Sequence, residues 1–282
     1  MNNVIEISGL CKNYDEFALK DVSFTLAQGS IMGFVGQNGA GKTTTIKSIL
    51  NMVNPDKGLI KLFGSDSFSK DAIGIVMDQP FFVADWTLAN VEQAVSAFYS
   101  EWRKDIYTNL LRKFGMDSLK KVKELSRGME MKLMIAIAMS HNAQLLIMDE
   151  PTSGLDPVAR DELMDLLLDF VEDGKKSVLF STHITSDLEK IADSITFIRN
   201  GSIVFSGSKR ELLSAYVMLK SNSEELADSL KKMIIGYRRF PAGFEGLAKK
   251  DSLFELPENI EKSVASLDDI VVYLSREGRS NE

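Results

Sequence analysis

One short segment of the sequence combines glycines, a lysine and a threonine in a pattern that suits phosphate chemistry. Gly36–Thr43 fits the pattern G-x-x-x-x-G-K-[ST] without a mismatch. Its glycines let successive backbone N–H groups point toward phosphate oxygens, and a following helix adds the positive end of its dipole. Lys42 brings a full positive charge, and the Thr43 hydroxyl is a ligand for Mg²⁺. The predicted phosphate-binding residues are Gly36, Asn38, Gly39, Ala40, Gly41, Lys42, Thr43 and Thr44.

A second segment carries two acidic residues at the end of an apolar run. Leu145–Met148 has the composition of a buried strand, and Asp149 and Glu150 follow it directly. Because the carboxyl ends of parallel strands meet at one edge of a sheet, we expect Asp149 beside the phosphate-binding loop. Asp149 is then placed to hold Mg²⁺, and Glu150 to act as general base on the attacking water. Many strands end in solvated acids, so this prediction depends on the pairing with the loop.

The hydrophobic patterns place both segments in an α/β fold. Ser30–Val35 is a short apolar run before the loop, and Thr43–Asn51 has helical spacing after it. Strands alternating with helices imply a largely parallel sheet, interrupted by a helical insertion at about residues 80–142. Further strands are expected at Val4–Leu10, Val22–Leu26, Leu59–Phe63, Ile73–Met77, Ser177–Phe180, Ile195–Ile198 and Ile203–Phe205. Further helices are expected at Val91–Tyr99, Lys104–Phe114, Met129–Ser140 and Val158–Val171. A hairpin turn is expected at Asn200-Gly201.

The composition is that of an ordinary globular chain. Of its 282 residues, 44% are hydrophobic and 26% charged, which supports a core without disulfides. The single cysteine, Cys11, builds no disulfide framework and suits a reducing cytosol. The net charge of −7 argues against nucleic acid as a main partner. No apolar stretch approaches the roughly 20 residues that cross a bilayer, and the amino terminus lacks a signal-peptide pattern, so we expect a cytoplasmic protein.

Five shorter motifs, in order along the chain, complete a family resemblance. They are Lys12-Asn13-Tyr14, Met77-Asp78-Gln79-Pro80, Leu125-Ser126-Arg127-Gly128-Met129, Ser153-Gly154-Leu155-Asp156 and Ser181-Thr182-His183. With the two segments above, they make Val4–Leu213, about three quarters of the chain, resemble the nucleotide-binding domain of ABC (ATP-binding cassette) transporters. The resemblance implies the P-loop ABC ATPase fold, in which an antiparallel β subdomain and the helical insertion join the mixed sheet. It also implies a domain at residues 1–213 and a C-terminal extension at residues 214–282.

The resemblance assigns roles within the site. It implies that Gln79 contacts Mg²⁺ and the attacking water, and that His183 contacts the γ-phosphate and orients that water. Tyr14 matches the aromatic residue that stacks on adenine, with Phe17 as the alternative. Without the resemblance, Gln79 is a solvated loop residue, His183 an ordinary histidine and Tyr14 a surface residue of a strand.

Two motifs point to a second protomer. Ser126 and Gly128 match the family's signature sequence, which reaches ATP held by the other protomer, and Asp156 matches the loop that crosses the interface. The resemblance therefore implies a homodimer or heterodimer closed by ATP. Ser126 is equally compatible with a plain helix N-cap, and Asp156 with an Asp-Pro helix start. Arg127 and Met129 stand where the family usually has Gly and Gln.

The family implies an active ATPase that uses ATP and Mg²⁺. It would power a separate transmembrane permease from the cytoplasmic face of the cell membrane. The altered signature and the ending Ser266–Tyr273 resemble a subgroup of bacterial ABC-2-type exporters of peptides or antibiotics. The alternative is a soluble ABC ATPase of cytosolic assembly, of the iron–sulfur type, with no permease. The C-terminal extension of about 70 residues is not expected in that class.

Two regions carry expectations of their own. The helical insertion would hold a groove for a coupling helix of the permease. Phe81, Phe82 and Trp86 are candidates either to line that groove or to form the core of the insertion. Phe98 is expected in the core of the insertion. The C-terminal extension is expected to be a dimerising or regulatory domain, or else packing decoration.

Overall fold

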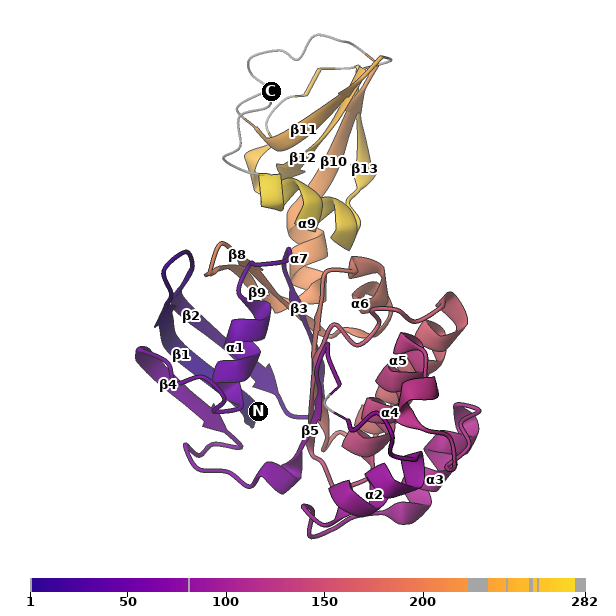
Figure 1. Ribbon diagram of the computed structural model, residues 1–282. Helices are drawn as coiled ribbons and strands as arrows, with labels where there is room; N and C mark the ends of the chain where they lie inside the picture. Colours follow the sequence, from indigo (N-terminus) through magenta and orange to yellow (C-terminus); the bar gives the residue numbers. More distant parts are fainter. Residues whose placement is uncertain are drawn as a thin grey trace.

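The computed structural model describes residues 2–80, 82–222, 233–241, 243–253, 256–257 and 259–276. In this part of the chain the strands form three sheets, of six, three and four strands (Figure 1). The six-stranded sheet lies between the three-stranded sheet on one side and helices α2 to α5 on the other. The four-stranded sheet belongs to the C-terminal extension and lies beyond one end of this arrangement.

The central sheet is largely parallel, as the alternation of strands and helices predicts. Its strands stand in the order β5-β6-β7-β3-β8-β9, and every neighbouring pair is parallel except β8 with β9. They are β3 (Ile31–Val35), β5 (Ile73–Val76), β6 (Leu145–Asp149), β7 (Ser177–Thr182), β8 (Ser194–Arg199) and β9 (Ser202–Ser208). Every residue of β3, β6 and β7 is buried, because helices or a second sheet cover both faces.

A smaller antiparallel sheet packs on one face of the central sheet, with helix α1 (Lys42–Ile49) between them. Its order is β2-β1-β4, and its strands are β1 (Asn3–Asn13), β2 (Ala18–Ala27) and β4 (Lys57–Leu62). Ile46 of α1 is fully buried in one apolar cluster with Ile5 of β1 and Ile147 of β6. The helix that follows the phosphate-binding loop is therefore fixed between two sheets.

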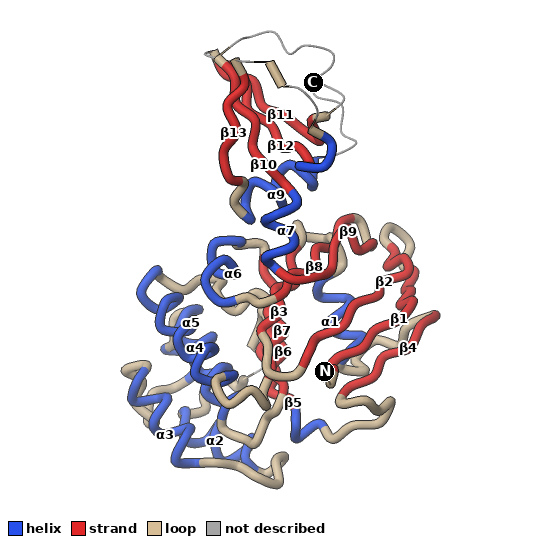
Figure 2. The backbone as a smooth tube through the Cα atoms, turned by 180° about the vertical axis from the view of Figure 1, so that it is seen from behind, coloured by secondary structure: helices blue, strands red, loops and turns tan. Residues whose placement is uncertain are grey.

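The other face of the central sheet is covered by helices α4, α5 and α6 (Figure 2). The helical insertion supplies α2 (Leu88–Ser96), α3 (Lys104–Lys113) and α4 (Arg127–Met139), which are followed by α5 (Pro157–Val171) and α6 (Thr185–Ile191). Helix α4 approaches β5 so closely that a Cβ at Gly74 would lie 2.4 Å from the carbonyl oxygen of Ala138. Only glycine allows this approach. Short 3₁₀ turns at Lys70–Ala72, Val122–Glu124 and Lys250–Ser252 complete the connections.

Phe98 does not lie in the core of the insertion, so that prediction is wrong. Its side chain is 82% exposed. Helix α2 ends at Ser96, and Phe98 follows in a turn in which its N–H donates to the carbonyl oxygen of Val95 at 3.0 Å. In a helix continued to Tyr99, Phe98 would share the buried face of Val91, seven residues earlier. The turn rotates it away from that face.

The described part of the C-terminal extension is an antiparallel sheet with one helix. Its strands, in the order β11-β12-β10-β13, follow α7 (Lys209–Ala215). They are β10 (Tyr216–Ser221), β11 (Ile234–Phe240), β12 (Gly243–Lys249) and β13 (Ile260–Val264), and α9 (Leu267–Arg276) closes the described chain. Ile270 and Tyr273 of α9 are buried in one cluster with Met218 of β10 and Leu247 of β12. Among the described residues, no helix is long and apolar enough to span a bilayer.

The turn between β8 and β9 has the geometry that its Asn-Gly sequence predicts. Asn200 and Gly201 both have positive φ, at 48° and 78°, as a type I′ turn requires. The N–H of Gly201 donates to the carbonyl oxygen of Ala40 at 3.0 Å, and its own carbonyl accepts from the N–H of Lys20 at 2.8 Å. The turn therefore ties the central sheet to both the phosphate-binding loop and β2.

Replacement of Gly201 by alanine is expected to destabilise the protein strongly. A Cβ there would lie 1.8 Å from the carbonyl oxygen of Ala18, in addition to the strain of positive φ. Gly174→Ala is the matched control, because Gly174 has φ of 69° and no atom lies within 4 Å of an added Cβ. Strain alone costs about 1 kcal/mol, which lowers the apparent Tm by about 2–4 °C. We expect at least twice that loss for Gly201→Ala in a thermal melt, and equal losses would contradict the clash.

Candidate functional site

The phosphate-binding loop runs from the end of β3 to the start of α1, and two of its glycines are required by space. A Cβ at Gly36 would lie 2.6 Å from the carbonyl oxygen of Ile198. Gly41 has φ of 115°, and its Cβ would lie 2.6 Å from Leu19 and 3.0 Å from the ring of Phe17. The N–H groups of the first turn of α1 have no partner within the helix, so the loop presents an anion-binding arrangement.

A cavity of about 670 Å³ opens over this loop. Its size is that of a typical small-molecule site, and most of the residues that line it are polar or charged. The predicted site residues that line it are Asn38, Gly39, Gly41, Lys42, Thr43, Thr44, Asp149, Glu150 and His183. The other lining residues are Glu16, Phe17, Gln37, Asp78, Arg127 and Ser153.

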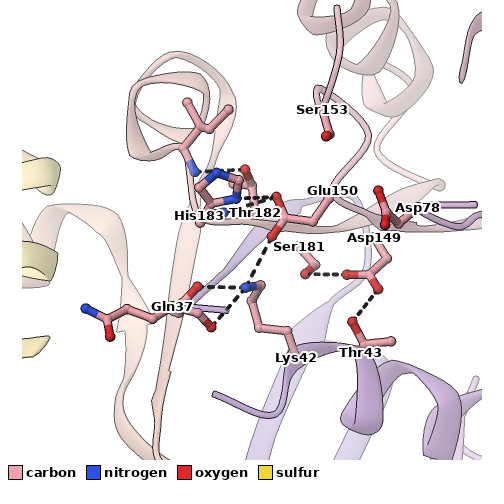
Figure 3. Close-up of polar contacts among 12 residues, drawn as sticks. Gln37, Lys42, Thr43, Asp78, Asp149, Glu150, Ser153, Ser181, Thr182 and His183 are labelled. Atoms are coloured by element: carbon pink, nitrogen blue, oxygen red, sulfur yellow. Dashed lines mark hydrogen bonds and ion pairs between the residues drawn. The ribbon is translucent and has the colours of Figure 1, made fainter. Parts of the chain in front are cut away.

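The ammonium group of Lys42 is held at the floor of the cavity (Figure 3). The side chain is only 5% exposed, and Nζ donates to the carbonyl oxygens of Gly36 at 2.7 Å and Gln37 at 3.3 Å. Nζ also lies 3.2 Å from Oε1 of Glu150. A buried ammonium needs such partners, because its desolvation is otherwise costly. The charge is thus fixed where the phosphates of a nucleotide would meet it.

Asp149 is the most enclosed carboxylate of the cavity, with 1% exposure. The Thr43 hydroxyl donates to its Oδ2 at 2.7 Å, and the Ser181 hydroxyl donates to its Oδ1 at 2.9 Å (Figure 3). Hydroxyl and carboxylate oxygens are the donors that Mg²⁺ prefers, and that ion takes few protein ligands when phosphates supply the rest. The chemistry of Thr43 and Asp149 therefore fits Mg²⁺.

Glu150 and His183 contact each other across the ends of β6 and β7. Oε2 of Glu150 lies 2.7 Å from Nδ1 of His183 and accepts the backbone N–H of His183 at 3.3 Å. The backbone N–H of Glu150 donates to the carbonyl oxygen of Ser181 at 2.9 Å. Glu150 has a φ of 53°, a left-handed conformation that is rare for this residue type and costs roughly 1 kcal/mol or more. Such strain is common at functional sites, and here it turns the carboxylate toward Lys42.

Four predicted residues of the loops around the cavity do not line it. Gly36 and Ala40 are buried behind the loop, where Gly36 offers its carbonyl oxygen to Lys42. Gln79 is exposed and lies outside the lining, whereas its neighbour Asp78 is part of it. Tyr14 is 48% exposed and also lies outside.

Phe17, not Tyr14, is the aromatic residue on the cavity wall. Its ring lies against Gly41 in the phosphate-binding loop, as the 3.0 Å approach to an added Cβ shows. The N–H of Tyr14 donates to the carbonyl oxygen of Phe17 at 2.8 Å, which closes the turn between β1 and β2. That turn directs Phe17 to the cavity and leaves Tyr14 beside Lys12, whose Nζ lies 5.9 Å from the ring centroid.

The three residues that the resemblance assigns to a second protomer lie outside the cavity of their own chain. Ser126 is exposed at the start of α4, and its hydroxyl accepts the N–H of Met129 at 3.3 Å. Asp156 caps α5 by accepting the N–H groups of Val158 and Ala159, and these bonds lower the pKa of its carboxyl. Gly128 lies close to the turn after β6, where an added Cβ would lie 3.0 Å from the carbonyl oxygen of Gly154. Ser126 and Asp156 therefore serve as helix N-caps in this chain.

Arg127 reaches into the cavity of its own chain. Its Nη2 lies 2.7 Å from Oδ1 of Asp78 and donates to the Ser153 hydroxyl at 3.1 Å. Its side chain also covers Gly154, where an added Cβ would lie 3.2 Å away. Both charged partners are about half exposed, so the ion pair contributes at most about 1 kcal/mol. Its main effect is to place a positive charge on the cavity wall and to connect the insertion with the turn after β6.

Sequence reasoning gave no role to Ser181, Asp78 and Ser153. Ser181 pairs with Asp149 in the parallel register of β6 and β7, so its hydroxyl faces that carboxylate. The predicted strand ends contained this signal, because both residues sit at the carboxyl ends of neighbouring strands. For Asp78 and Ser153 the contact with Arg127 depends on the packing of the insertion, which no local pattern contains.

The comparisons with known proteins agree with this geometry. Residues 19–153 match the family described as ABC transporter. The uncharacterized ABC transporter ATP-binding protein YxlF of Bacillus subtilis is 30% identical, over 90% of this chain and 87% of its own length. The bacitracin transport ATP-binding protein BcrA of Bacillus licheniformis is 32% identical, over 72% of this chain and 69% of its own length.

A solved structure of an ATP binding subunit of an ABC transporter has the same fold. It superposes with a TM-score of 0.67 at 27% identity, covering 74% of this chain and 91% of that one. The resemblance seen in the motifs and the predicted fold class are thus confirmed. This chain belongs to the ABC transporter family as an ATP-binding subunit, and it is an ATPase.

Proposed function

We propose that this chain powers an exporter by closing an ATP-bound dimer, in which each ATP lies between two protomers. The main support for this proposal is that the cavity of one chain is lined by only some of the residues that are expected to contact ATP. Lys42 and Glu150 line the cavity, whereas Ser126 is exposed outside it. Ser126 and Gly128 of another protomer would complete the site, with Asp156 close to the interface. The chain itself does not distinguish a homodimer from a heterodimer.

In the proposed reaction, a nucleotide phosphate competes with Glu150 for the ammonium group of Lys42. The released carboxylate then accepts a proton from the water that attacks the γ-phosphorus, and ADP and phosphate form. His183 lies 2.7 Å from Glu150 and would orient that water. Substrate binding therefore prepares the base.

Mg²⁺ is the proposed metal, held by Thr43 and Asp149. When bound, it neutralises charge on the β- and γ-phosphate oxygens. The Ser181 hydroxyl fixes the second oxygen of Asp149, so the carboxylate has one orientation. Gln79 stays a proposed contact of the metal and the water on the family resemblance, next to the lining residue Asp78.

The proposed partner is a permease at the inner face of the cell membrane, and the proposed cargo is a peptide or antimicrobial compound. The subgroup resemblance and the relative named for bacitracin transport support this proposal. Within the insertion, Trp86 is 40% exposed and Phe82 is partly buried, so Trp86 is the accessible candidate for contact with the permease. Phe81 lies outside the described residues.

Substitution of the proposed base should separate binding from hydrolysis. Glu150→Gln is expected to lower kcat by at least about 100-fold, because the amide does not take the proton. The same variant should bind ATP normally and accumulate an ATP-dependent dimer in light scattering. Glu172→Gln, an exposed carboxylate at the end of α5, is the control and should retain wild-type turnover. Wild-type turnover in Glu150→Gln would contradict the assignment of the base.

The two aromatic candidates for the adenine are distinguishable by nucleotide affinity. Stacking of a base on an aromatic ring is worth about 1–3 kcal/mol. Phe17→Ala is therefore expected to raise the Kd for ATP by about 5- to 150-fold, whereas Tyr14→Ala should leave it within about twofold. Fluorescence titration measures both. The opposite ranking would return the role to Tyr14.

Recovery of the partner tests the transporter assignment. The chain, tagged in its natural host and extracted from membranes in mild detergent, is expected to carry a hydrophobic multispanning chain with it. Trp86→Ala should reduce that recovery, whereas Phe240→Ala, an equally exposed aromatic on β11, should not. Recovery only in a soluble assembly would favour the alternative of a cytosolic ABC ATPase.

A further inference from the structure

The C-terminal extension contacts the segment that carries His183. Helix α9 lies on the side of the extension that faces the rest of the protein, and it packs on α6 (Figure 1). Strand β7 ends at Thr182 and α6 begins at Thr185, so His183 lies in the two-residue connection between them. Along the backbone, a constraint on α6 therefore reaches His183 through one residue, Ile184.

Two hydrogen bonds fix α9 on α6. The Thr185 hydroxyl donates to Oδ1 of Asp268 at 2.8 Å, and the backbone N–H of Leu267 donates to Oε1 of Glu189 at 2.6 Å. Thr185 is 3% exposed, so water does not replace the first bond easily. Leu188 of α6 and Leu267 of α9 are fully buried in the same apolar cluster, which keeps the two helices together.

The amino-terminal end of α6 gains support from these bonds, because its own cap is weak. The helix is seven residues long, and its N-cap, Ile184, makes no side-chain cap hydrogen bond. The N–H of Ile184 donates to the Thr182 hydroxyl at 2.9 Å, which ties the connection to β7. His183 is thus held from β7 on one side and from Thr185 on the other.

Asp268 is not needed for the start of its own helix. The neighbouring residues Ser266 and Asp269 cap α9 by reciprocal bonds. The Ser266 hydroxyl donates to Oδ2 of Asp269 at 2.7 Å, and it accepts the N–H of Asp269 at 3.1 Å. The carboxylate of Asp268 is therefore free for the contact between the helices, and the two adjacent acids have separate roles.

We propose that the C-terminal extension sets the position of His183 against Glu150, through the bonds of Asp268 and Leu267 to α6. Thr185, Glu189 and Asp268 are positioning residues that contact no reacting atom. The inference rests on the proposed role of His183 in hydrolysis. The rate of hydrolysis then depends on the packing of α9 against α6.

The test compares full-length variants by kcat at saturating MgATP and by the Kd for ATP. Thr185→Val removes the hydroxyl at nearly constant volume, and Asp268→Ala removes the acceptor. Each is expected to lower kcat by about 3- to 10-fold with an unchanged Kd, while Thr185→Ser, which keeps the hydroxyl, retains wild-type kcat. Asp269→Ala is the matched control, because it removes the carboxylate that accepts from Ser266 but keeps the Ser266 cap bond to the backbone and the contact with α6. It should keep wild-type kcat.

The double variant Thr185→Val/Asp268→Ala should be no slower than the slower single variant, because both changes remove one bond. Additive losses, wild-type kcat in either single variant, or an equal loss in Asp269→Ala would overturn the proposal. Hydrogen exchange of residues 183–191 gives a readout independent of turnover. It should be faster in Asp268→Ala than in Asp269→Ala, and equal exchange would count against the proposal.

His183→Ala, measured in parallel, distinguishes the proposed role of His183 in hydrolysis from its proposed positioning by the C-terminal extension. Wild-type kcat in that variant would remove the proposed role of His183 itself. A slow His183→Ala together with wild-type rates in Thr185→Val and Asp268→Ala would overturn the positioning role alone.

Discussion

The confinement of one ammonium group is the constraint on which the rest of the site depends. Lys42 is almost fully buried, and its charge is balanced by two loop carbonyls and the Glu150 carboxylate. A buried cation with fewer partners would destabilise the fold by several kcal/mol. The loop must therefore keep its carbonyls turned inward, and Glu150 must stay in a left-handed conformation to reach the lysine. The same arrangement leaves the cation ready to exchange a carboxylate for a phosphate.

The residues around the Lys42 ammonium group could be predicted from the sequence where they lie at the carboxyl ends of strands. Asp149 ends one buried strand, and Glu150 and His183 directly follow buried strands of the same parallel sheet. Parallel register brings such ends together without further information. Lys42 and Thr43 are fixed by a glycine pattern that joins a strand to a helix. The central sheet, its flanking helices and the Asn-Gly turn depend on local periodicity and turn chemistry, which the sequence contains directly.

Some residues could not be placed correctly from the sequence, because their positions depend on the geometry of turns or on packing between segments far apart in the chain. Phe17 and Tyr14 lie in one turn, and only its closing hydrogen bond decides which ring faces the cavity. Phe98 follows the last turn of α2, which ends three residues before the predicted end at Tyr99, and this difference leaves Phe98 exposed. Arg127 reaches Asp78 because the insertion packs against the sheet. The strands of the C-terminal extension pair in the order β11-β12-β10-β13. No local sequence pattern specifies that contact or that strand order.

The position of the C-terminal extension matters because its helix α9 contacts two elements that lead to the nucleotide site, α6 and the end of β8. One end of α9 meets α6 next to His183, while near its other end the carbonyl oxygen of Leu274 accepts a hydrogen bond from Arg199, at the end of β8. The turn after β8 bonds in turn to Ala40 in the phosphate-binding loop. Because α9 also shares a continuous apolar cluster with α6, a displacement of the extension would cost buried area as well as hydrogen bonds. His183 and the phosphate-binding loop are therefore both connected to α9, which lies beyond the Val4–Leu213 segment that resembles the ATP-binding domain.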